Sequence, residues 1–208
     1  MYDSIFISYR RENSSTFAGM LYDVLCKRFP SSGVFKDKNK LYAGKDFNKQ
    51  IEDAIDQSFA VLVLINKGWL ELTNESGKKK LFDKEDYIRL EIRTGILKEK
   101  YILPVLFDGG QMPRKKDLPE DIKKFCDFQA FQVDPDNITK SIKHLEEHIN
   151  TLSIDRLEGT LVKSFVKLKK DPAGTLKNIS NSYMNLLKRE GNAVIGYFNK
   201  VKKKKKDK

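Results

Sequence analysis

Ala60-Val61-Leu62-Val63-Leu64-Ile65 is an unbroken apolar run, rich in β-branched side chains, in this chain of 208 residues. A strand with one face in water alternates apolar and polar residues, whereas a continuous apolar run is typical of a strand covered on both faces. Strands of that kind occur in parallel sheets with helices on either side. The run therefore predicts the central strand of a parallel sheet.

Strands and helices are predicted to alternate around this run. Further strands are expected at residues 4–9, 33–36, 101–107 and 128–131. Helices are expected at residues 17–25, after the capping candidates Asn13, Ser14 and Ser15, and at residues 138–149. Two more helices are expected, one that begins behind a cap at Asp46 and one that begins at Asp83 or Asp86. Repeated βα units imply an α/β fold, a flavodoxin-like five-stranded parallel sheet flanked by helices. Pro104 lacks an N–H group, so it should face an edge, an end or an irregularity.

Charge divides the chain unevenly. The net charge is +11, but residues 1–150 hold 25 Lys+Arg against 24 Asp+Glu, and residues 151–208 hold 15 against 5. We expect one domain over residues 1–150 and a basic, mainly helical extension over 151–199. Residues 200–208 are mostly lysine, so we expect a disordered tail. It is either a solvated segment that aids solubility or one that binds anionic surfaces weakly by charge.

Composition favours a soluble, cytoplasmic protein. The sequence contains no apolar run long enough to span a bilayer and no secretory signal at its start. Cys26 and Cys126 have no CxxC spacing, which favours reduced, packed thiols. His144 and His148 lack a third ligand, so no metal is expected. No G-x-S-x-G motif is present.

Aromatic, cationic and acidic residues follow the predicted strands, at the edge where parallel α/β sheets bind ligands. Tyr9 and Arg10 follow the first strand, Gly44 and Lys45 lie in the loop after the second, and Trp69, Tyr87 and Glu91 follow the third. Aromatic rings can stack on a base and guanidinium groups can pair with phosphates. Such a set suits a dinucleotide.

Three segments together resemble the TIR (Toll/interleukin-1 receptor) domain in its bacterial form. They are Phe6-Ile7-Ser8-Tyr9-Arg10-Arg11, Leu41-Tyr42-Ala43-Gly44-Lys45-Asp46-Phe47 and Asp86-Tyr87-Ile88-Arg89-Leu90-Glu91-Ile92. The resemblance covers about residues 1–150 and implies the TIR fold. The family contains adaptors that self-associate through the loop after the second strand, and enzymes that cleave NAD⁺ at the nicotinamide–ribose bond.

The resemblance implies roles for individual residues. Glu91 matches the catalytic glutamate of the enzymatic members, and Tyr9 and Arg10 would border the base and phosphates of NAD⁺. Gly44 and Lys45 would shape the loop over the substrate. Two positions depart from the enzymatic pattern, since Tyr87 stands where a tryptophan is frequent and Tyr42 where some members carry an acidic residue.

Three functions remain open from the sequence. The resemblance favours an NAD⁺ glycohydrolase or cyclase in bacterial antiphage signalling. NAD⁺ would be the substrate and no cofactor would be needed. The expected partners are other TIR domains, through self-association, and an effector or activator protein. A non-enzymatic TIR adaptor or host-mimicking virulence factor is the second. The third is a nucleic-acid-binding protein recruited by its basic tail.

Deleting residues 199–208 tests whether the tail is separable from the chemistry. We expect NAD⁺ turnover to stay within a few-fold, because every candidate site residue lies in residues 1–150. Salt-sensitive binding to DNA, RNA or anionic vesicles should disappear, because the tail attracts anions by charge alone. A folded truncated protein that no longer turns over NAD⁺ at low salt would place the tail in the active assembly.

Overall fold

The computed structural model describes residues 4–29, 33–35 and 46–168, and within this part of the chain the elements alternate between strand and helix. Residues 2–149 form one compact unit, and a second unit begins at Asn150. The strands are β1 (Ser4–Ser8), β2 (Val34–Phe35), β3 (Ser58–Ile65), β4 (Tyr101–Leu106) and β5 (Phe131–Gln132). The α-helices are α1 (Arg11–Arg28), α2 (Phe47–Asp56), α3 (Tyr87–Leu97) and α4 (Ile138–Leu168), and the 3-10 helices are η3 (Lys80–Phe82), η4 (Lys115–Asp117), η5 (Glu120–Asp127) and η6 (Pro135–Asn137).

The five strands form one parallel sheet in the order β2-β1-β3-β4-β5. This is the flavodoxin-like order, in which the chain reverses direction across the sheet between β1 and β3. Strand β3 lies at the centre, and all eight of its residues are buried. The predicted fold class and the predicted central strand are both confirmed.

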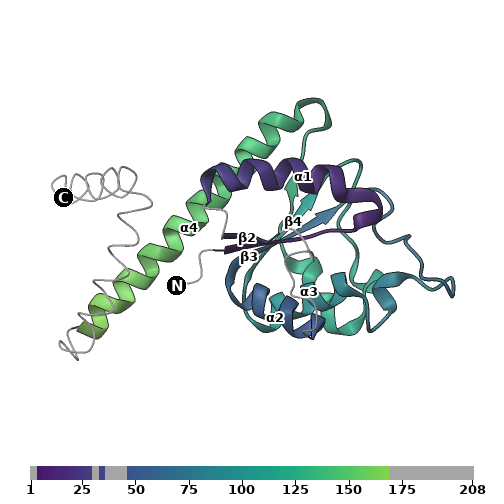
Figure 1. Ribbon diagram of the computed structural model, residues 1–208, viewed down its shortest axis with the longest axis horizontal. Coiled ribbons are helices and arrows are strands. Elements are labelled where there is room, and N and C mark those ends of the chain that lie inside the picture. Colours follow the sequence, from purple (N-terminus) through teal and green to yellow (C-terminus); the bar gives the residue numbers. More distant parts are fainter. Residues whose placement is uncertain (1–3, 30–32, 36–45, 169–208) are drawn as a thin grey trace. The chain divides into compact units, whose positions relative to one another are not determined.

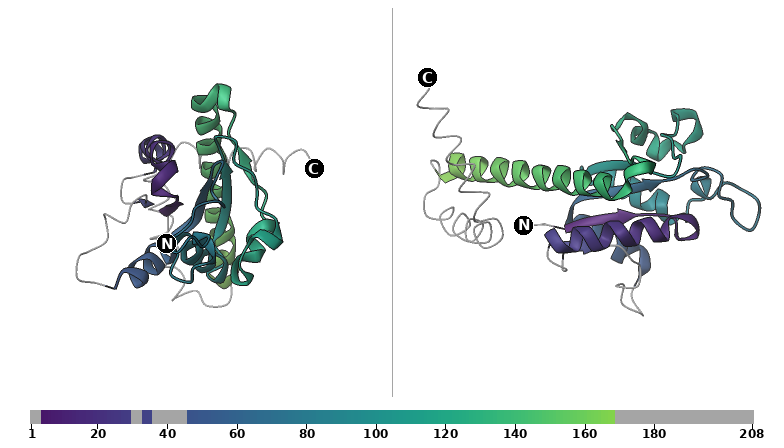
Figure 2. Two further views of the ribbon diagram at one scale, coloured as in Figure 1. Left: turned by 90° about the vertical axis from the view of Figure 1, so that its right-hand side faces the viewer. Right: turned by 90° about the horizontal axis from the view of Figure 1, so that it is seen from above.

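Helices cover both faces of the sheet, with α1 on one side and α2 and α3 on the other (Figure 1). Val61, Val63 and Ile65 of β3 join the core cluster that α2, α3 and η5 complete. Side chains alternate along a strand, so Ala60, Leu62 and Leu64 face the opposite layer. The first turns of α4 lie beside α1 on that layer (Figure 2), where Arg28 and Glu146 form an ion pair with a nitrogen–oxygen distance of 3.8 Å.

Two predicted helix starts are confirmed by their caps. The Asp46 side chain accepts a hydrogen bond from the backbone N–H of Lys49 at 3.1 Å, and the Asp86 side chain accepts one from that of Arg89 at 3.0 Å. A carboxylate at this position satisfies a free N–H of the first turn and opposes the positive end of the helix dipole. Of the two starts proposed for the Glu91 helix, the structure selects Asp86.

The predicted cap of α1 is wrong. The helix begins at Arg11, immediately after the strand, and its N-cap residue Arg10 makes no side-chain cap hydrogen bond. The three capping candidates, Asn13, Ser14 and Ser15, all lie inside the helix, where the Ser15 hydroxyl donates to the carbonyl of Arg11 at 2.6 Å. A serine hydroxyl can bond the carbonyl four residues earlier within a helix, so a serine near a helix start does not fix the boundary.

The fifth strand is displaced from its predicted position at residues 128–131. Residues 120–127 form η5, which buries Ile122 and Phe125, and Phe128 ends that helix. In the described part of this segment, Phe131 and Gln132 pair with β4, opposite Val105 and Leu106. Phe128 and Ala130, the apolar residues before them, pack against the core cluster and not in the sheet. A short apolar run does not distinguish these two uses.

Pro104 lies in β4, opposite Val63 of the central strand. Among the described residues, the ladder to β5 begins only at Val105, so the proline lies where β4 has no strand on its outer flank. The expectation of an edge, an end or an irregularity is confirmed.

Helix α4 continues to Leu168, well past the Ile149 end predicted for it. The rest of the predicted extension, residues 169–199, and the lysine-rich tail lie outside the described residues. No helix within the described ranges has the length and apolarity that crossing a bilayer requires.

Gly110, in the loop after β4, allows a close approach of two backbone segments. A Cβ atom at this position would lie 2.0 Å from the carbonyl oxygen of Ile65, at the end of β3. We expect Gly110→Ala to lower the free energy of unfolding by about 2–3 kcal/mol, because the backbone must shift to relieve the overlap. Urea denaturation measures the change.

Gly95→Ala is the matched control. Its Cβ would meet the end of the Ile102 side chain, and not backbone, at 3.3 Å, and alanine favours a helix over glycine. The control should therefore change stability much less than Gly110→Ala does. Equal midpoints for Gly110→Ala and the unsubstituted protein would contradict the close approach.

Candidate active site

A groove of about 460 Å³ opens at the carboxyl edge of the sheet, between the end of β1, the start of α3 and the segment that precedes α3. Parallel α/β sheets place their ligand sites at this edge. The groove is lined by Tyr9, Arg10, Arg11, Glu12, Asn74, Lys80, Asp83, Glu85, Asp86, Tyr87 and Ile88.

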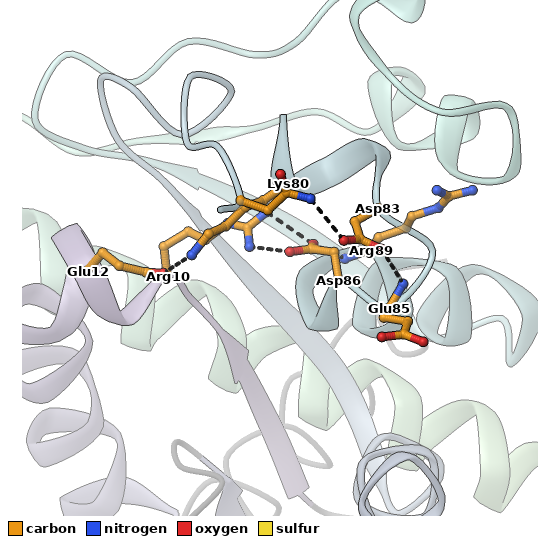
Figure 3. Close-up of polar contacts among 8 residues, drawn as sticks. Arg10, Glu12, Lys80, Asp83, Glu85, Asp86 and Arg89 are labelled. Atoms are coloured by element: carbon orange, nitrogen blue, oxygen red, sulfur yellow. Dashed lines mark hydrogen bonds and ion pairs between the residues drawn. The ribbon is translucent and has the colours of Figure 1, made fainter. Parts of the chain in front are cut away.

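An ion pair between Arg10 and Asp86 lies in the wall of this groove (Figure 3). Two guanidinium nitrogens contact the two carboxylate oxygens, with Nη2 to Oδ1 at 3.0 Å. Both side chains are 6 % exposed. A planar guanidinium matches a carboxylate in this two-point geometry, which fixes orientation as well as distance. Because Asp86 also caps α3, the pair ties the end of β1 to the start of that helix.

Glu91 lies one turn along α3 from Tyr87 and is only 3 % exposed. The neighbouring Ile88 and Ile92 pack into the core and fix the rotation of the helix. Residues three and four apart share a helix face, so Glu91 lies on the same side as the two groove residues Tyr87 and Ile88. Glu91 does not itself line the groove; the helix places its shielded carboxylate one turn from Tyr87, a residue of the groove wall.

Tyr9 and Tyr87 are the aromatic residues of the groove. Tyr87 is 40 % exposed and packs edge-on against Phe47, with ring centroids 4.7 Å apart. This contact links the start of α3 to the start of α2. An exposed phenol ring held in this way offers a face on which a base or a nicotinamide can stack.

Trp69 requires a correction, because the structure places it in the core and not in the groove. It is 2 % exposed and stacks on Phe125, with ring centroids 6.2 Å apart. An indole covered by protein has no free face for a substrate. Gly44 and Lys45, together with Tyr42, lie outside the described residues.

Sequence reasoning missed the polar residues that α1 and η3 add to the groove. Lys80 forms an ion pair with Glu12, and the hydrogen bond from Lys80 holds the pKa of Glu12 below its usual value. The backbone N–H of Glu85 and, second, the side-chain amide of Asn74 donate hydrogen bonds to Asp83 and lower the pKa of its carboxyl group. These carboxylates are therefore ionised at neutral pH. Glu12 and Lys80 are 68 positions apart, so no local pattern signals the contact.

The histidine pair and the two cysteines do not line the groove. His148 contacts the Tyr101 hydroxyl at 3.3 Å, and no group of three or more metal-ligating side chains occurs within residues 4–29, 33–35 and 46–168. Cys26 and Cys126 are free thiols, as predicted. Burial raises the pKa of Cys126, which disfavours the reactive thiolate.

We expect Arg10→Ala to lower the free energy of unfolding by about 3 kcal/mol, because it leaves the Asp86 carboxylate buried without its guanidinium. Arg114→Ala is the control, since its pair with Asp117 is exposed and should contribute little. Urea denaturation of both variants measures the difference. A loss for Arg10→Ala no larger than that for Arg114→Ala would show that the buried pair is not a stabilising tie.

Two curated proteins are similar to this chain in sequence. Over 127 residues the chain is 29 % identical to the NAD(+) hydrolase tir-1 of Caenorhabditis elegans, which covers 61 % of this chain and 12 % of that protein. It is 28 % identical over 154 residues to the NAD(+) hydrolase sarm1 of Drosophila melanogaster, covering 74 % of this chain and 11 % of that one. The chain thus spans about a tenth of the length of these relatives.

The fold agrees with that of the TIR domains in the activated Roq1 resistosome that recognises the effector XopQ. The TM-score is 0.54 at 18 % identity, and the match covers 70 % of this chain and 98 % of the other. The family model for the TIR domain matches residues 5–142, from β1 into α4. This chain therefore belongs to the TIR domain family.

Proposed function

We propose that the protein cleaves NAD⁺ at the nicotinamide–ribose bond, with Glu91 as the catalytic carboxylate. The observation that carries the proposal is the position of Glu91, a shielded carboxylate one helical turn from the exposed Tyr87 ring at the groove. The two animal relatives named NAD(+) hydrolases support it at the level of the family.

The chemistry needs few groups. Nicotinamide leaves as a neutral base from a positively charged linkage, so no general acid is required. Positive charge develops on the ribose as the bond breaks, and a fixed carboxylate in a water-poor position stabilises that charge strongly. Tyr87 would stack on a ring of the substrate, and Tyr9 would contact the rest of the dinucleotide.

Two products follow from the same cleavage. Attack by water gives ADP-ribose, and attack by the adenine or a ribose hydroxyl of the same molecule gives a cyclic ADP-ribose. NAD⁺ is the substrate in both cases, and the proposal includes no cofactor. Chromatography of the products from purified protein separates the two outcomes.

The proposed setting is antiphage signalling in the bacterial cytoplasm, with activity raised by association of TIR domains and by an effector or activator protein. The basic tail adds weak binding to anionic surfaces. The alternative is a TIR adaptor without catalysis. Release of nicotinamide by purified protein distinguishes the two, because an adaptor without catalysis releases none.

We expect Glu91→Gln to reduce NAD⁺ cleavage at least about 100-fold, because the amide is isosteric but cannot oppose the developing charge. Glu52→Gln is the control, since it makes the same chemical change at an exposed position of α2. Nicotinamide release gives the rate, and thermal melting shows whether each variant is folded. A folded Glu91→Gln protein with unreduced turnover would end the assignment of Glu91.

A further inference from the structure

The described wall of the groove contains three cations and four carboxylates. A dinucleotide carries phosphates, and a cation of the groove can bind one of them only if it can leave the carboxylate with which it is paired. Exposure and geometry separate two of them, Arg10 and Lys80, whose ion-pair partners also line the groove.

Arg10 is poorly suited to exchange. Its guanidinium makes two contacts to Asp86, and both side chains are almost fully buried. A phosphate that displaced Asp86 would leave this carboxylate buried without its charge partner, which is strongly unfavourable. It would also remove the cation that holds the cap of α3 in place.

Lys80 is well suited to exchange. Its side chain is 30 % exposed and that of Glu12 is 46 % exposed, and one ammonium–carboxylate contact joins them. An exposed pair of this kind contributes little to stability, because water solvates both charges when they separate. Lysine carries its ammonium on a flexible stem and offers three donors to any nearby anion.

The backbone of Lys80 is anchored, whereas its partly exposed side chain can rotate. Its N–H donates to the carbonyl of Leu72 at 2.7 Å, and the next residue, Leu81, is buried in the core. Figure 3 shows the Lys80 side chain reaching toward Glu12 beside the Arg10–Asp86 pair. A small rotation of a long side chain is thus enough to change its partner from Glu12 to a ligand in the groove.

We propose that Lys80 binds a phosphate of the substrate and that Glu12 is its built-in competitor. The identity of the ligand as NAD⁺ rests on the proposed function. In the resting groove Glu12 neutralises Lys80, and substrate binding breaks this pair. Removing the charge of Glu12 therefore strengthens binding, whereas removing that of Lys80 weakens it.

The test measures binding separately from cleavage. Titration calorimetry with NAD⁺ is performed in a Glu91→Gln background, so that the ligand is not consumed. We expect Glu12→Gln to lower the Kd about 3- to 5-fold and Lys80→Gln to raise it about 10-fold. Lys80→Arg should keep most of the affinity. In the Lys80→Gln protein, adding Glu12→Gln should have no further effect, because the two residues act on each other.

Two controls make the result specific. Lys79→Gln and Glu75→Gln remove the same charges from exposed neighbours that do not line the groove, and they should leave the Kd unchanged. Nicotinamide riboside lacks phosphate, so its affinity should not respond to Lys80 or Glu12. Thermal melting confirms that each variant is folded.

The proposal is overturned if Glu12→Gln weakens NAD⁺ binding, if Lys80→Gln matches Lys79→Gln, or if NAD⁺ does not bind. Failure of the proposed function has a different signature. In that case NAD⁺ binds with the expected ranking of variants, but protein that retains Glu91 releases no nicotinamide.

Discussion

The burial of β3 on both faces is the constraint on which the rest of the structure depends. A strand with eight buried residues needs a helical layer on each side, and parallel neighbours need crossover connections that supply those helices. The same arrangement brings the carboxyl ends of β1 and β3 to one edge, with the starts of α1 and α3 close by. The groove lies at this edge because loops there are free of the packing that fills the two layers.

The Arg10–Asp86 pair connects this scaffold to the candidate chemistry. Asp86 has two partners, the guanidinium of Arg10 and the backbone N–H of Arg89. One carboxylate therefore joins two segments distant in sequence and begins the helix that carries Glu91. Arg89 adds a second tie from the same turn, since its guanidinium contacts Asp121 at 3.0 Å and the carbonyl of Phe82 at 3.2 Å. A catalytic carboxylate must be held precisely, and these contacts fix its helix from both sides.

The charges of the groove divide into structural and exchangeable pairs. Arg10 is an obvious phosphate ligand from sequence, yet its burial with Asp86 gives it a structural role. Lys80 has no distinctive sequence context, yet its exposure makes its ion pair with Glu12 easy to break. Desolvation accounts for this difference. Exchanging the partner of a buried charge costs much free energy, whereas a solvated charge can exchange its partner at little cost.

The sequence by itself determined the order of the elements, the parallel sheet, the central strand and the cap at Asp46, and it left the start of the Glu91 helix between Asp83 and Asp86. These features follow from local periodicity and from side chains that bond their own backbone within a few residues. It also singled out Glu91, Tyr87, Tyr9 and Arg10 as residues near one edge. Only the tertiary structure decided that Trp69 packs in the core, that β5 begins at Phe131, and that Lys80 pairs with Glu12. Burial and ion pairing depend on which residues meet across long separations, and a single sequence does not encode those distances in any local pattern.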